Sequence, residues 1–138
     1  MGKRRQSREC AIQFLYQIDI AGSDNLQNKL DAFWKEQEVS EDIKEFSNKI
    51  INMVLEHKDE IDKQIVSHAT NWDITRIAIV DRNILRTAIG ELMYMDDIPP
   101  IVSINEAVDI AKAYGTNESG KFVNGILDNI RKDSGKER

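Results

Sequence analysis

The sequence predicts a single all-α domain of about seven helices. Apolar residues recur at intervals of three and four along almost the whole chain of 138 residues, which is the spacing of one helix face. No stretch combines alternating apolar and polar residues with a hairpin signal, so no strand is expected. The two candidate linkers, residues 71–75 and 96–102, are too short to separate independent domains.

Four helices are expected in the first half of the chain. The first follows Ser7, a residue type favoured at N-caps, and ends near Gly22. Ser40 is expected to cap the third helix, and the pattern breaks near His57 before the fourth. The apolar stripes of these four helices are, in order, Ala11, Phe14, Leu15 and Ile18; Leu26, Leu30, Phe33 and Trp34; Ile43, Phe46, Ile50 and Val54; and Ile61, Ile65, Ala69 and Trp72.

The second half begins near residue 73 and is expected to hold the remaining helices. A long helix should stop before Pro99 and Pro100, because proline cannot continue a helix. Ser103 and Glu106 form the pattern of a capping box for the next helix, and Gly115 suits its C-cap. The last segment, residues 132–138, has no apolar residue and should fray. The apolar stripes here are Ile84, Leu85, Ala88, Ile89 and Leu92; Ile104, Ala107, Val108 and Ala111; and Phe122, Val123, Ile126, Leu127 and Ile130.

Four positive charges stand within the first eight residues of a chain whose net charge is −5. We call Lys3, Arg4, Arg5 and Arg8 the basic arm. Such an arm suits a polyanion, because each cation that neutralises a phosphate releases condensed counterions. A mobile, solvated tail is the alternative. The overall acidity argues against a protein that coats nucleic acid indiscriminately, so binding should be local.

Several classes of protein are not expected. No apolar run approaches the roughly 20 residues needed to cross a bilayer. The single cysteine, Cys10, has no partner for an internal disulfide and fits a reducing cytoplasm. His57 and His68 are too far apart along the chain to share a metal. No catalytic constellation is visible, so we expect neither an enzyme nor a cofactor.

Residues 115–122 match the glycine and lysine spacing of a phosphate-binding loop but end at Phe122, which has no hydroxyl for magnesium. An amphipathic helix precedes this segment, whereas such a loop should follow a buried strand. A different use is favoured, in which Thr116 and Ser119 cap the last helix and its exposed N–H groups attract a phosphate, with Lys121 adding charge. Phe122 then either stacks on a base or belongs to the core.

Three stretches stand in an order and spacing typical of one family. They are residues 4–11 with Gln13, Leu15, Tyr16 and Asp19; residues 81–86 with Glu91, Leu92, Ile98 and Pro99; and residues 104–108 with Ala111, Lys112 and residues 121–128. Together they resemble the NusB family of bacterial transcription antitermination factors. The likeness spans the chain from about residue 3 to residue 130.

The resemblance implies two packed helical subdomains, about residues 1–72 and 73–138. It also implies an RNA-binding antitermination factor of the cytoplasm, with no membrane association. Its partners would be NusE, which is a protein of the small ribosomal subunit, boxA-type single-stranded RNA, other Nus factors and RNA polymerase. The complex would support transcription and maturation of ribosomal RNA. A protein adaptor without RNA contact is the alternative, and a homodimer is left open.

By position, the resemblance assigns two surfaces. The RNA-binding residues would be Lys3, Arg4, Arg5, Arg8, Glu118, Ser119, Lys121 and Phe122. The NusE-contacting residues would be Tyr16 and Asp81, with Arg82 and Arg86 as neighbours. A core position beside Leu15 is the alternative for Tyr16. Gly120 departs from the family pattern and is expected to make the RNA-facing loop flexible.

Overall fold

The computed structural model describes residues 2–69 and 73–135, and in this part of the chain all regular secondary structure is helical. The predicted all-α class and number of helices are confirmed for these residues. Trp72, expected on the fourth helix, lies outside the described residues. The elements are α1 (Lys3–Ala21), α2 (Leu26–Glu36), α3 (Glu41–Glu56), α4 (Lys58–His68), the short 3₁₀ helix η1 (Ile74–Arg76), α5 (Ile79–Tyr94), α6 (Pro100–Tyr114) and α7 (Asn117–Asp133).

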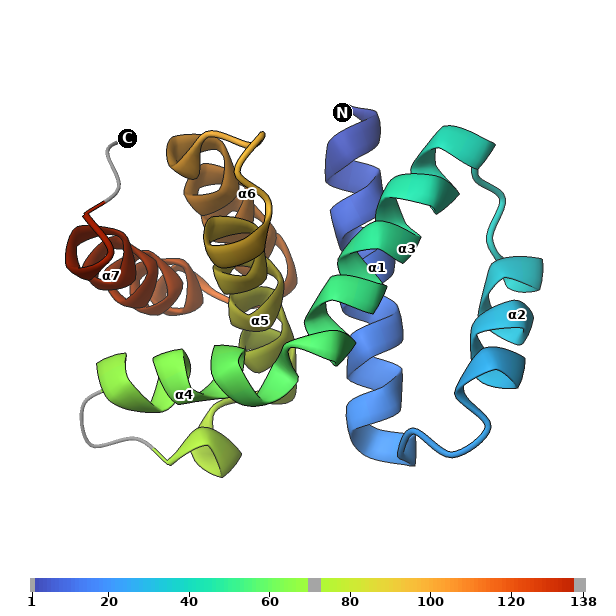
Figure 1. Ribbon diagram of the computed structural model, residues 1–138, viewed down its shortest axis with the longest axis horizontal. Helices are drawn as coiled ribbons and strands as arrows, with labels where there is room; N and C mark the ends of the chain where they lie inside the picture. Colours follow the sequence, from blue (N-terminus) through green and yellow to red (C-terminus); the bar gives the residue numbers. More distant parts are fainter. Residues whose placement is uncertain (1, 70–72, 136–138) are drawn as a thin grey trace.

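Helix α5 forms the centre of the fold. Ten consecutive residues, 83–92, are buried, because α5 packs against α1, α3, α4, α6 and α7. Figure 1 shows α1 running between α2 on one side and the α5–α6 pair on the other, with α3 crossing α1 diagonally toward α5. One continuous apolar core therefore receives side chains from both halves of the chain. The division into two subdomains near residue 72 stays a prediction.

Helix α1 begins at Lys3, five residues earlier than predicted from an N-cap at Ser7. Ser7 is not its N-cap. Its hydroxyl lies inside the helix and donates a hydrogen bond to the carbonyl of Lys3 (2.9 Å), while its own carbonyl accepts one from Ser47 of α3. The basic arm is therefore the first two turns of a docked helix, which excludes the mobile-tail alternative for this structure.

Helix α6 also begins earlier than predicted, at Pro100, and the capping box expected at Ser103 does not form. Proline suits the first helical position, where no N–H donor is needed. The Ser103 hydroxyl instead donates to Glu91 of α5 (2.7 Å), and Glu106 reaches Arg5 of α1. The side chains of Ser103 and Glu106 therefore connect α6 to other helices and do not cap the N-terminus of α6.

The caps of the last helix are confirmed. The Thr116 hydroxyl accepts from the Ser119 backbone N–H (3.2 Å), and the Ser119 hydroxyl accepts from the Thr116 N–H (3.4 Å). The expectation that Gly120 loosens this region is wrong, because Gly120 lies buried within α7. A Cβ atom there would stand 2.7 Å from Cγ of Lys112, so glycine allows the close approach of α6 and α7.

A buried ion pair joins α1 to α5. The Arg8 guanidinium donates to both carboxylate oxygens of Glu91 at 2.8 Å, and both side chains are almost completely buried. Ser103 of α6 donates a third hydrogen bond to the same carboxylate. A buried carboxylate needs such partners, since an unpaired charge in the interior is very costly.

Replacing this carboxylate should destabilise the protein strongly. Glu91→Gln removes the charge that compensates Arg8, and we expect the free energy of unfolding to fall by about 3–5 kcal/mol in urea denaturation. Glu60→Gln is the control, because Glu60 pairs with Lys63 on the exposed face of α4 and such pairs contribute little. Equal unfolding curves for the two variants would contradict a structural role for the Arg8–Glu91 pair.

Candidate nucleic-acid interface

The cations of the basic arm point to three different sides of α1, because successive residues of a helix are turned by about 100°. Arg4 faces α3, where its guanidinium carbon lies 3.7 Å from the centre of the Phe46 ring. Arg5 faces α6 and Arg8 faces the core. The arm therefore presents its charge on two outer flanks of one helix rather than as a single patch.

Arg5 is held by two carboxylates of α6. Its Nε and Nη2 donate to the two oxygens of Glu106 at 2.9 and 2.6 Å, and Nη2 also donates to Asp109 at 3.0 Å. These hydrogen bonds raise the pKa of Arg5 and lower the pKa of Glu106. Within the described residues no hydrogen bond is found for Nη1, so one edge of a fixed cation remains for a ligand.

Arg8 does not belong to an exposed binding surface in this structure, contrary to the sequence-based assignment. Its side chain is 4% exposed and is held by Glu91, with Glu106 at 3.5 Å. Glu106 is therefore shared between Arg8 and Arg5. Through this shared carboxylate, Arg8 positions Arg5, and contact with RNA would require breaking the buried pair.

The beginning of α7 carries the second set of predicted RNA-binding residues. Lys121 and Glu118 are exposed and lie 3.6 Å apart, and Ser119 is part of the helix cap. Phe122 is partly buried and packs against the core, so it is neither a full core residue nor fully exposed. The charge of Lys121, the N-terminus of α7 and the partly exposed ring of Phe122 therefore lie within the first two turns of one helix.

The basic arm and the beginning of α7 are both attached to α6. Arg5 binds Asp109, and the stem of Lys112 lies against Gly120. Asp109 and Lys112 are three residues apart, so they lie on the same helix face and are separated by about 5 Å of helix rise. Helix α6 thus brings two segments that are more than a hundred residues apart in the sequence onto one face.

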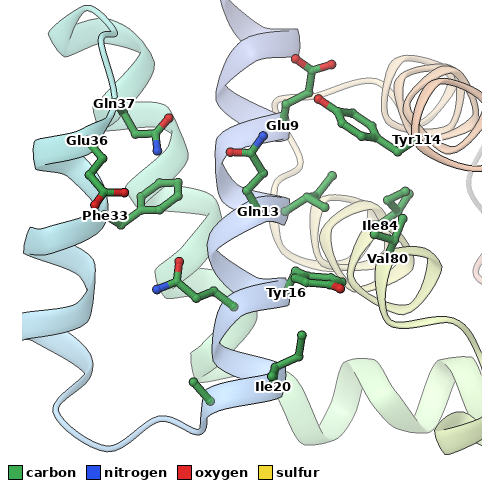
Figure 2. A pocket seen from close by; sticks show the side chains of 13 residues that line it. Glu9, Gln13, Tyr16, Ile20, Phe33, Glu36, Gln37, Val80, Ile84 and Tyr114 are labelled. Atoms are coloured by element: carbon green, nitrogen blue, oxygen red, sulfur yellow. The ribbon is translucent and has the colours of Figure 1, made fainter.

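A separate apolar hollow of about 550 Å³ lies beside α1. Figure 2 shows Tyr16 and Ile20 pointing from α1 toward the side of Val80 and Ile84 on α5, with Tyr114 at the end of α6 nearby. Tyr16 is 38% exposed, Ile20 60% and Tyr114 52%, which excludes a core position for Tyr16. Three large apolar side chains exposed around one hollow are typical of a protein-binding site.

Asp81 lies at the start of α5, close to the beginning of α7. Burial raises the pKa of Asp81, and a hydrogen bond with Ser119 partly opposes this shift. Asp81 was assigned to partner contact and Ser119 to RNA contact, so the two predicted surfaces meet at this pair. Val80, the preceding residue, lines the apolar hollow.

The other two predicted partner residues are engaged within the protein. Arg86 is buried, donating to Asp62 at 2.8 and 3.1 Å and to Asp19 at 2.9 Å, so its assignment to an exposed surface is not supported. Arg82 bonds Asp19 at 3.4 Å and the carbonyl of Ile77 at 3.2 Å. Both arginines hold the end of α1 against α5.

Sequence reasoning missed residues of both surfaces. Glu106 was interpreted only as a helix cap, and Asp109 carried no motif. Ile20 was not assigned, although it stands four residues after Tyr16, a spacing that puts two side chains on one helix face. In the residues that the structure covers, no cluster of potential ligands could hold a metal ion. No helix in the described part of the chain is long and apolar enough to span a membrane.

The Arg5–Glu106 pair should make stability depend on acidic pH. Because the hydrogen bond from Arg5 lowers the pKa of Glu106 below its ordinary 4.5, its stabilising contribution is complete above that value. The contribution disappears as pH falls through the lowered folded-state value. When the pH is lowered from about 5.5 to about 3, the urea concentration at the unfolding midpoint should therefore fall less for Glu106→Gln than for the parent.

The control for this titration is Glu118→Gln, which changes an exposed carboxylate on α7. It should follow the parent at every pH. If Glu106→Gln loses as much stability on acidification as the parent does, the pair does not act as a pH-dependent contact.

Comparison with known proteins places the chain in a family. The profile of the NusB family matches residues 5–132. The transcription antitermination protein NusB of Methylacidiphilum infernorum (isolate V4) is 47% identical over 137 residues, covering 99% of this chain and 96% of the relative. The protein of that name from Thermodesulfovibrio yellowstonii is 46% identical over 140 residues, covering 95% of this chain and 93% of the relative.

Solved structures agree with this grouping. T. maritima NusB superposes with a TM-score of 0.84 at 39% identity, covering 94% of this chain and 91% of the other. A crystal structure of the antitermination factors NusB and NusE in complex with dsRNA superposes with a TM-score of 0.80 at 30% identity, covering 96% and 98%. The match to the family profile, the close full-length relatives and the shared fold together show that this chain belongs to the NusB family.

Proposed function

We propose that this protein is a non-enzymatic, RNA-binding transcription antitermination factor that acts together with NusE. It binds boxA-type single-stranded RNA, joins other Nus factors on RNA polymerase and supports the transcription and maturation of ribosomal RNA. Membership of the NusB family and the relative solved with NusE and dsRNA support this proposal. The observation that carries it is the placement of the basic arm and the beginning of α7 against one face of α6.

In this proposal the RNA contacts Lys3, Arg4, Arg5 and Lys121, with one base stacked on the partly exposed ring of Phe122. Their phosphate contacts would supply affinity that does not depend on sequence. Single-stranded RNA is favoured because its unpaired bases are open to side chains, whereas the major groove of an RNA duplex is too narrow. Arg8 does not contact RNA in this proposal but positions Glu106 and, through it, Arg5. Glu118 forms an ion pair with Lys121 and so partly neutralises its charge.

NusE is proposed to cover the apolar hollow beside α1. Tyr16 is the expected centre of this contact, because an exposed aromatic residue with a polar tip is a common hot spot. Ile20 and Tyr114 extend the apolar area around it. Asp81 follows Val80, which lines the hollow, and contacts the beginning of α7 through a hydrogen bond with Ser119.

An adaptor that binds NusE without touching RNA is the second candidate, favoured by the internal ion pairs of Arg5 and Arg8. Fluorescence anisotropy of labelled boxA RNA distinguishes the two functions. The protein is titrated alone and with equimolar NusE, against a scrambled strand and against the same RNA as a duplex. Selective binding that tightens with NusE supports the RNA-binding function. Absence of RNA binding in both conditions, with NusE still bound, favours the adaptor.

Removing one arm cation should weaken RNA binding without unfolding the protein. Arg5→Ala should lower the affinity of the NusE complex for boxA RNA and reduce the slope of log K against log salt by about 0.7, the value for one phosphate contact on a single strand. Arg76→Ala is the matched control, since exposed Arg76 lies in η1, at the opposite end of the molecule from the start of α1 (Figure 1). An unchanged slope for Arg5→Ala would remove Arg5 from the interface.

Truncating Tyr16 should weaken the NusE complex. Tyr16→Ala is expected to raise the Kd for NusE about 30-fold or more in calorimetry, because hot-spot aromatics commonly contribute 2 kcal/mol or more. Tyr94→Ala is the control, since Tyr94 on α5 is 37% exposed, almost the same as Tyr16, but lies outside the hollow and stacks on His57. Similar losses in the two variants would place NusE elsewhere.

A further inference from the structure

A second hollow, of about 530 Å³, lies on the opposite flank of the basic arm, between the beginning of α1 and α3. This volume is within the range of small-molecule sites. Lys3 and Arg4 contribute from α1, whereas Phe46 and Lys49 contribute from α3. Neither α3 residue was assigned a binding role from the sequence or from the resemblance, and Phe46 was expected only in the apolar stripe of its helix. The hollow is therefore built half from predicted RNA-binding residues and half from a helix with no assigned function.

The floor of this hollow is a stacked pair. The Arg4 guanidinium lies 3.7 Å from the centre of the Phe46 ring, and the Phe46 ring is otherwise buried in the core. Stacking on the ring orients the guanidinium plane and leaves Arg4 exposed on its other side. Unstacked RNA bases bind to planar arginine groups of this kind as well as to aromatic rings. Arg4 thus offers a prepared surface for one base.

The charges around the hollow fit one phosphate. Lys3 is paired with Asp42 at 3.2 Å, so this carboxylate competes with a phosphate for the Lys3 ammonium group. Lys49 is exposed, and no ion pair is found for it within the described residues. Glu45, also at the hollow, provides an acceptor for the amino group of a base. One open cation, one stacking plane and one acceptor correspond to a single nucleotide rather than to a run of phosphates.

We propose that this hollow binds one nucleotide of the RNA, with its base on Arg4 and its phosphate at Lys49. This inference rests on the proposed RNA-binding function and extends the RNA surface from α6 across the start of α1 to α3. The geometry of α1 supports this path. Arg4 and Arg5 are neighbours turned by about 100° from each other, so a strand that contacts Arg5 on the α6 side reaches Arg4 on the α3 side by crossing the helix start.

Two substitutions on α3 provide the first test. Lys49→Gln should weaken binding of single-stranded boxA RNA by the NusE complex roughly fourfold at 0.15 M salt and reduce the salt slope by about 0.7. Lys44→Gln removes the same charge from the same helix, but Lys44 lies beside Trp34 at another hollow. It should bind RNA like the parent. Equal effects of the two substitutions would show a general charge effect and overturn the nucleotide site.

Arg4→Lys is the second test, because it keeps the charge and removes the planar group. Affinity should fall about fivefold or more, as expected for loss of stacking under one base, while the salt slope stays unchanged. RNA carrying 2-aminopurine should show, at one position only, fluorescence quenching that is lost in Arg4→Lys. Unchanged affinity and quenching would overturn the proposal.

The outcomes separate this inference from the function on which it rests. If the parent binds boxA RNA and Arg5→Ala weakens this binding, but Lys49→Gln and Arg4→Lys leave it unchanged, the RNA surface does not extend to α3 and the nucleotide site is wrong. If the parent binds no RNA with or without NusE, the proposed function itself fails. If Lys49→Gln weakens NusE binding and leaves RNA binding unchanged, the hollow belongs to a protein contact and the nucleotide site is wrong.

Discussion

The buried pair between Arg8 and Glu91 determines how α1 is seated in the fold. It joins α1 to the central helix α5, and Ser103 adds α6 to the same carboxylate. Because α1 is fixed in rotation by this pair, Arg4 must face α3 and Arg5 must face α6. The directions in which Arg4 and Arg5 point therefore depend in part on an ion pair that is buried inside the protein.

The basic arm lies on an acidic body, and its nearest carboxylates have two opposing effects. Glu106 and Asp109 hold Arg5 in one orientation, which reduces the entropy lost when a phosphate binds. They also compete with that phosphate for the same guanidinium. A partly compensated, fixed cation gives weaker but more selective binding than a free tail would. This agrees with a protein whose proposed RNA affinity depends on a second protein.

Periodicity predicted the helices well because it reports which face of each helix is buried, and the caps of α7 were readable because Thr116 and Ser119 are local. The errors concern contacts over long sequence separations. Arg8 and Glu91 are separated by 83 positions and Arg86 and Asp19 by 67, and neither pairing leaves a local signal. Charge alone could not show that Arg8 and Arg86 are buried. Ser103 resembled a cap for the same reason, since its partner lies on another helix.

The contact between Asp81 and Ser119 places the two proposed surfaces side by side rather than at opposite ends of the molecule. Asp81 follows Val80, a residue that lines the hollow proposed for NusE, and Ser119 caps the helix whose N-terminus is proposed to meet RNA. A partner bound at Asp81 is therefore one hydrogen bond away from the beginning of α7, which gives a direct route for coupling between the two proposed surfaces. Thermodynamic linkage makes this reciprocal: whatever factor NusE adds to the affinity for RNA, RNA must add to the affinity for NusE.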